Sequence, residues 1–139
     1  MLDTILVALD CSDLCERVME TVQDLKLHSS TKVILSHVII PPESNLELPA
    51  DRPHPESPAL LYIEKQLQAF QAQLPVESDI EIVTGDPAEE IVRLANIHQA
   101  DMIVLGCRGL TGLKRIVQGS VSSEVLEAAN CSVLVVKPK

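Results

Sequence analysis

Short apolar runs alternate with longer amphipathic segments along this chain of 139 residues. The first run, Thr4 to Leu9, is almost continuously apolar and stops at Asp10. A run of this kind is typical of a strand that is buried on both faces, as in a parallel sheet. Later runs centred on aliphatic residues predict four more strands. The strands are expected at 4–9, 32–40, 79–83, 101–105 and 133–136.

The segments between these runs carry apolar residues at helical spacing, such as Val18, Met19 and Val22 in the first of them. Ser12 or Asp13 is suited to cap that helix. The third helix has the strongest start, because Asp86 takes the cap position and a proline and two glutamates follow it. The first predicted helix ends near Leu27, and the second covers 59–74. The third ends near His98, and the fourth covers 120–129.

Strands and helices therefore alternate through the whole chain. This order predicts an α/β protein: one domain over residues 1–139, with an open parallel five-stranded sheet and helices on both faces, Rossmann-like in architecture. Ligands of such sheets bind at the carboxyl ends of the strands, near the point where the strand order reverses. Asp10, Val38 and Gly106 all lie at or near predicted strand ends.

A proline-rich segment interrupts the pattern between the second strand and the second helix. Six of the nine prolines fall between Pro41 and Pro58. Because proline fixes φ and lacks a backbone donor, we predict a loop here. A mobile lid and a variable insertion are both compatible with this composition.

Composition and charge exclude several classes of function. The formal net charge is −9 and aromatic residues make up 1% of the chain, which argues against nucleic-acid binding and against an anionic membrane surface. No apolar run approaches the roughly 18 residues of a membrane span. The start of the chain lacks the pattern of a signal peptide, so a cytoplasmic location is expected. In that compartment the four cysteines are interpreted as ordinary small residues, the alternative being a redox-sensitive thiol.

The segment from Gly106 to Ser122 is the one that indicates chemistry. It leaves a predicted strand, is rich in glycine and leads into the helix expected at Ser120. Glycines let backbone N–H groups approach a phosphate, and a helix N-terminus adds unpaired N–H groups. The basic residues Arg108, Lys114 and Arg115 fall here without an intervening acid. A polyphosphate site is one interpretation, and a loop whose glycines only make turns is the other.

The glycine spacing matches neither the GxxxxGK[ST] loop nor the dinucleotide fingerprint that follows a first strand. It resembles the ATP-binding motif of the universal stress protein family, G-x2-G-x9-G-[ST]. Gly106, Gly109, Gly119 and Ser120 occupy its fixed positions. The opening strand with its aspartate, the 85–91 stretch, the strand before Gly106 and the closing strand are also similar to that family.

This resemblance implies the roles of individual residues. Asp10 would hydrogen-bond the ribose hydroxyls, and Gly106 would lie against the ribose. Ala8, Leu9 and Val38 would line the adenine site, with Val38 offering backbone groups to the base. The phosphates would be held, largely by backbone N–H groups, by Arg108, Gly109, Gly119, Ser120, Val121 and Ser122. A magnesium or manganese ion bridging phosphate oxygens, and ADP or AMP in place of ATP, are compatible with the same contacts.

Partners and catalysis are less directly indicated. The closing strand, Val133 to Val136, is apolar, and at a sheet edge it would pair with its copy in a second chain. The resemblance implies the same homodimer. We expect a nucleotide-dependent binding module with a protein partner, the alternatives being a slow ATPase or phosphotransferase and a purely structural dimer. No general base is evident near the glycine segment, which favours binding over hydrolysis. The histidines lack metal-ligand spacing, although His37 precedes Val38 near a strand end, a position from which it could approach the expected ligand.

Overall fold

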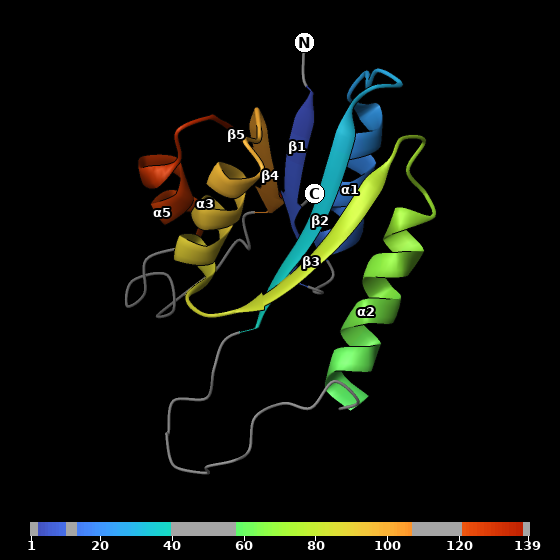
Figure 1. Ribbon diagram of the computed structural model, residues 1–139, viewed down its shortest axis with the longest axis horizontal. Coiled ribbons are helices and arrows are strands. Elements are labelled where there is room, and N and C mark those ends of the chain that lie inside the picture. The colour runs from blue at the N-terminus through green and yellow to red at the C-terminus, as the bar shows by residue number, and fades with distance from the viewer. Residues whose placement is uncertain (1–2, 11–13, 40–57, 107–120, 138–139) are drawn as a thin grey trace.

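Five parallel strands form one sheet in the order β3-β2-β1-β4-β5 (Figure 1). This computed structural model describes residues 3–10, 14–39, 58–106 and 121–137. The strands are β1 (Thr4–Ala8), β2 (Lys32–Ile39), β3 (Ser78–Thr84), β4 (Met102–Gly106) and β5 (Ser132–Val136). The parallel five-stranded sheet predicted from the apolar runs is therefore confirmed.

The described helices are α1 (Leu14–Asp24), α2 (Pro58–Gln71), α3 (Pro87–Ile97) and α5 (Val121–Ala128). Pro58 begins α2 and does not belong to the loop to which its composition assigned it. Proline is suited to a first helical turn, where its missing N–H leaves no bond unmade. The rest of the predicted loop, 41–57, lies outside the described residues.

Two helices end earlier than their apolar periodicity predicts. The first was expected to reach Leu27, but α1 ends at Asp24, and Leu25 and Leu27 pack against the core from the chain beyond it. The second was expected to reach Leu74, but α2 ends at Gln71. There the N–H of Leu74 bonds to the carbonyl of Gln71, a tight closing turn. An apolar side chain can reach the core without being helical, so periodicity overestimates the length of a helix.

Helices cover both faces of the sheet (Figure 1), and each face buries its own apolar cluster. On one face Ile5 and Val7 of β1 pack with residues of α1 and α2. On the other face Leu6 packs with residues of α3 and α5. Alternate side chains of a strand point to opposite faces, and here both sets are buried. Helices on both faces, as predicted, explain why β1 has no polar side chain between Ile5 and Leu9.

The start of α3 has the geometry that its sequence predicts. Gly85 has φ +153°, and a side chain there would press against Glu90. Asp86 is the N-cap, and its Oδ2 accepts a hydrogen bond from the N–H of Glu89 at 3.1 Å. Pro87 occupies the first helical turn. These bonds fix the start of α3 directly after β3, at the carboxyl edge of the sheet.

The direction in which the chain adds strands to the sheet reverses between β1 and β4. From β1 the chain adds β2 and β3 on one side, and then crosses to β4 and β5 on the other. The register pairs Ala8 with Leu105, so β1 and β4 end side by side. At the opposite edge Asp101 fixes this register, because its Oδ2 accepts the N–H groups of Asp3 and Thr4, each at 3.0 Å. Among the described helices, none is long and apolar enough to cross a membrane.

Candidate functional site

The carboxyl ends of β1 and β4 bring together two residues that the sequence singled out. Asp10 follows β1 by two residues and is exposed, and Gly106 is the last residue of β4. Since Ala8 is paired with Leu105, both positions lie at the same edge, beside the reversal in strand order. An exposed carboxylate next to a residue without a side chain, at this point of a parallel sheet, is suited to hold a polar ligand.

The carboxylate of Asp10 is contacted from helix α1. The thiol of Cys15, in the first turn of α1, donates to Oδ1 of Asp10 across 3.6 Å. Cys15 itself is buried, with 3% of its surface exposed. From the sequence, this cysteine was interpreted as an ordinary small residue, and its contact with Asp10 was not predicted. The only signal in the sequence was its position five residues after Asp10, at the start of the following helix.

A second set of bonds fixes the backbone just before Asp10. Nδ1 of His37 lies 2.8 Å from the carbonyl oxygen of Leu9. A carbonyl oxygen only accepts, so Nδ1 carries the proton of this bond. The N–H of Leu9 donates to the carbonyl of Ser36, and Oγ of Ser36 donates to the carbonyl of Val7. The end of β1 is therefore bound to β2 through side chains as well as through the ladder.

Ser36 was not identified from the sequence. It is completely buried, although it is polar and lies inside an apolar strand. Such a residue is retained in a core only where its hydroxyl finds a partner, which here is the carbonyl of Val7. A lone serine between Leu35 and His37 was the signal for this contact.

The residues expected to line an adenine site lie on different faces of the sheet. Ala8 and Val38 are partly buried and pack against the cluster of α3 and α5. The side chain of Leu9 is 3% exposed and belongs to the cluster of α1 and α2. Of the three, Ala8 and Val38 are on neighbouring strands and share a face. Leu9 instead contributes its backbone to the bonds with Ser36 and His37.

Helix α5 begins at Val121, one residue after the predicted start. Val121 is 38% exposed, whereas Ser122 is 7% exposed. The first N–H groups of a helix have no partner within it, so this end is suited to an anion. Arg108, Gly109, Gly119 and Ser120, the remaining residues of the expected phosphate site, lie outside the described residues.

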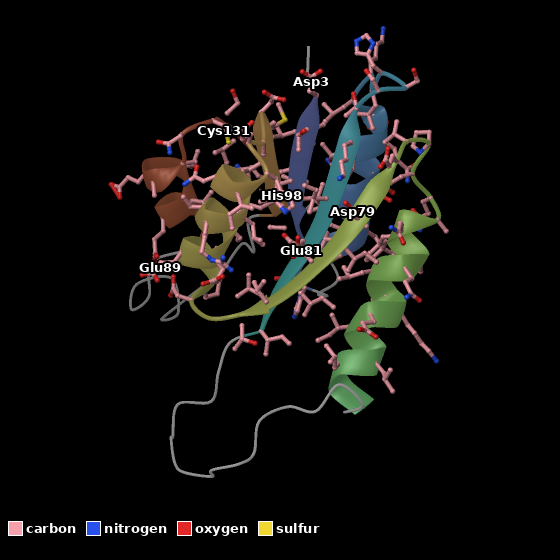
Figure 2. All side chains as sticks on the ribbon, in the orientation of Figure 1. Asp3, Asp79, Glu81, Glu89, His98 and Cys131 are labelled. Carbon is pink, nitrogen blue, oxygen red and sulfur yellow. The ribbon has the colours of Figure 1, made fainter. Side chains whose placement is uncertain are left out.

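The remaining titratable groups do not form a second centre within the described part of the chain. No group of three or more His, Cys, Asp or Glu residues there is placed to hold a metal ion. His98, at the end of α3, lies 3.0 Å from Glu81 of β3 and joins the helix to the sheet (Figure 2). Burial, with a smaller effect of Asp101, raises the pKa of the Cys131 thiol. A raised pKa disfavours the reactive thiolate, so Cys131 does not have the character of a redox-sensitive thiol.

A shallow groove of about 390 Å³ runs between α3 and α5. Its lining includes the apolar residues Ala88, Val92 and Ala128 and the charged residues Glu89, Arg93 and Glu124. Figure 2 shows Glu89 at the start of α3, far from Asp3 and Cys131 at the other edge of the sheet. Of the residues predicted to bind a nucleotide, none of those that the structure describes lines this groove.

Comparison with known proteins agrees with this geometry. The model of the universal stress protein family matches residues 1–137. The chain belongs to the universal stress protein family. The resemblance drawn from the glycine spacing and the strand ends is thus confirmed.

Individual members of the family match over different lengths. Universal stress protein Sll1388 of Synechocystis is 30% identical, with 96% of each chain covered, and YxiE of Bacillus subtilis is 26% identical over 99% of this chain and 100% of its own. Universal stress protein MJ0531 of Methanocaldococcus jannaschii is 44% identical over 73 residues, which are 52% of this chain and 43% of MJ0531. The matched stretch thus spans less than half of that relative.

Solved structures share the fold along nearly the whole chain. MJ0577 of Methanocaldococcus jannaschii has a TM-score of 0.70 and 30% identity, with 99% of this chain and 96% of MJ0577 covered. At3g01520 of Arabidopsis thaliana, solved with AMP bound, has a TM-score of 0.70 and 24% identity over 99% of this chain and 92% of its own. A universal stress protein in complex with cAMP has a TM-score of 0.72 and 23% identity, with 97% and 96% covered.

Proposed function

We propose that this universal stress protein binds ATP at the carboxyl edge of its sheet and acts as a nucleotide-dependent binding module in a stress or signalling response. The observation that carries the proposal is that Asp10 and Gly106 lie at the carboxyl ends of adjacent strands, β1 and β4, at the strand-order reversal. Gly106 is also the first residue of the glycine motif that ends at Ser120, directly before α5.

Each part of the nucleotide has a proposed contact. The carboxylate of Asp10 accepts hydrogen bonds from the ribose hydroxyls, and Gly106 lets the ribose approach the backbone. Ala8 and Val38 share a face and form the side of the adenine site, with backbone groups of Val38 available to the base. The phosphates lie on the glycine segment and the first turn of α5, where N–H groups and the helix dipole favour negative charge.

One feature supports a triphosphate, and a second supports an adenine nucleotide in general. Arg108, Lys114 and Arg115 give the glycine segment a positive charge in a chain of net charge −9. The cAMP and AMP complexes of structural neighbours support an adenine nucleotide of some kind at this fold. A magnesium or manganese ion would be held mainly by phosphate oxygens, because the described residues offer no cluster of metal ligands.

We place this binding in the cytoplasm and within one domain over residues 1–139.

The test is to denature freshly purified protein and identify any released nucleotide by chromatography. Released ATP, or saturable binding of added ATP with magnesium, is the expected result. A protein that releases no nucleotide and shows no heat of binding with ATP would contradict the proposal. A phosphate-release assay on the same sample separates binding from the slow ATPase or phosphotransferase alternative, which predicts turnover.

We also propose that the chain forms a homodimer through β5. This strand pairs only with β4 in the described sheet, so its outer edge is available to a second copy. Leu134 and Val135 are partly buried and aliphatic, which suits an edge that becomes covered. Light scattering at micromolar concentration is expected to give twice the monomer mass. A monomer under these conditions would exclude the dimer.

A further inference from the structure

We propose that Cys15 is a positioning residue for Asp10, and that through Asp10 it sets the preference of the site for a ribose that carries its hydroxyls. The inference rests on the proposed function, because it needs Asp10 to meet the ribose. It goes beyond that function by assigning the selectivity to a thiol on another element.

The contact joins a rigid donor to an exposed acceptor. Asp10 is exposed and lies two residues beyond Ala8, the last residue of β1. Cys15 is 3% exposed and belongs to the cluster that contains Val18 and Met19 of the same helix. Its Sγ lies 3.6 Å from Oδ1 of Asp10. The core therefore holds the thiol, and the thiol restrains the carboxylate.

The backbone before Asp10 is restrained from the other side. Nδ1 of His37 donates to the carbonyl of Leu9 at 2.8 Å, and the N–H of Leu9 donates to Ser36 at 2.8 Å. The peptide before Asp10 is thus held by β2. The bond from Cys15 restricts the rotamer of the Asp10 side chain.

The chemistry of the thiol fits this role. A thiol is a weak donor, and a carboxylate is an acceptor with two oxygens. Engagement of Oδ1 by the thiol orients the plane of the carboxylate without replacing the oxygens that a diol needs. Two vicinal hydroxyls donate best to a carboxylate whose plane is already set, because less side-chain freedom is lost on binding. The effect should appear with a ribose and vanish with a sugar that has no hydroxyls.

The experiment compares the dissociation constants of ATP and 2′,3′-dideoxyATP by calorimetry, both with magnesium. The wild-type protein is expected to prefer ATP on the order of tenfold or more, because charge-assisted hydrogen bonds are lost with the hydroxyls. Asp10→Ala is expected to remove this preference. Cys15→Ala is expected to lower it about threefold through weaker ATP binding, with dideoxyATP unaffected.

Three controls separate positioning from packing. Cys15→Ser keeps a donor of similar size and is expected to retain the preference. Val18→Ala removes buried volume one turn along α1 without touching Asp10, and is expected to leave the preference unchanged. In an Asp10→Ala background, Cys15→Ala is expected to have no further effect. Should alanine leave an unstable protein, Cys15→Val gives the same test, since valine also lacks a donor.

The outcomes distinguish the two proposals. Suppose that Asp10→Ala removes the preference for ATP over dideoxyATP, while Cys15→Ala or Cys15→Val shows the same preference as the wild-type protein. The role of Cys15 is then overturned, and the nucleotide site stands. If Asp10→Ala keeps the wild-type preference, Asp10 does not meet the ribose, and both the ribose contact and the role of Cys15 are overturned. An equal loss with Val18→Ala would also overturn the role of Cys15, since it would make the effect one of packing.

Discussion

Replacing Gly109 and Gly119 together by valine is expected to weaken ATP binding by on the order of 100-fold or more. In the motif these glycines let backbone N–H groups face the phosphates, and a branched side chain at either position occupies that space. Loss of two or three charge-assisted hydrogen bonds at about 1.5 kcal/mol each gives an effect of this size. Calorimetric titration with magnesium and ATP measures it, and circular dichroism checks that the variant is folded.

The matched control is Gly112→Val. Gly112 lies in the same segment but falls between the fixed positions of the motif. This variant is expected to bind ATP within about threefold of the wild-type protein, a difference of less than 1 kcal/mol. Equal losses in the double variant and in Gly112→Val would mean that the motif spacing has no special role. Full ATP affinity in the folded double variant would remove the glycine segment from the site.

The second large effect is expected in the core. Leu6→Ala should lower the free energy of unfolding by about 3–5 kcal/mol, because Leu6 is completely buried in the central strand and packs with α3 and α5. The loss of stability has two parts. One is the lost transfer free energy of the removed side-chain atoms, and the other is the cost of the cavity left between the sheet and the helices. Urea unfolding followed by circular dichroism, at fixed protein and nucleotide concentrations, measures the change.

Leu126→Ala is the control for the same chemical change. Leu126 lies on α5 with 55% of its surface exposed, so its truncation should change the free energy of unfolding by less than about 1 kcal/mol. A small effect of Leu6→Ala would contradict the two-layered core described above. A large effect of Leu126→Ala would instead indicate that the outer face of α5 is covered, for example by a second chain.

The start of α3 is a feature that the local sequence predicts correctly. Glycine, aspartate and proline in succession at Gly85, Asp86 and Pro87 predicted the cap, and the structure has all three in those roles. These preferences act through bonds within a few residues, so they survive in any tertiary context. The end of α1 was predicted less well, since Leu25 packs against the core from outside the helix.

The candidate site was predicted in part. Asp10 and Gly106 were placed at strand ends from the apolar runs alone, and the strand order then put these ends on adjacent strands. The thiol of Cys15 and the ring of His37 could not be assigned in this way. Their contacts depend on how closely α1 and β2 approach the end of β1, which is set by packing across the sheet.

The sequence by itself determined the alternation of strands and helices, the burial of the strands on both sides and the glycine motif. Each of these features depends on residues that are near one another in the chain, through the periodicity of apolar positions or the spacing of glycines. The tertiary structure alone decided the strand order β3-β2-β1-β4-β5, the separation of Leu9 from Ala8 and Val38, and the support of Asp10 by Cys15. These features depend on contacts between elements, and many strand orders are compatible with the same apolar pattern until the helices pack on the sheet.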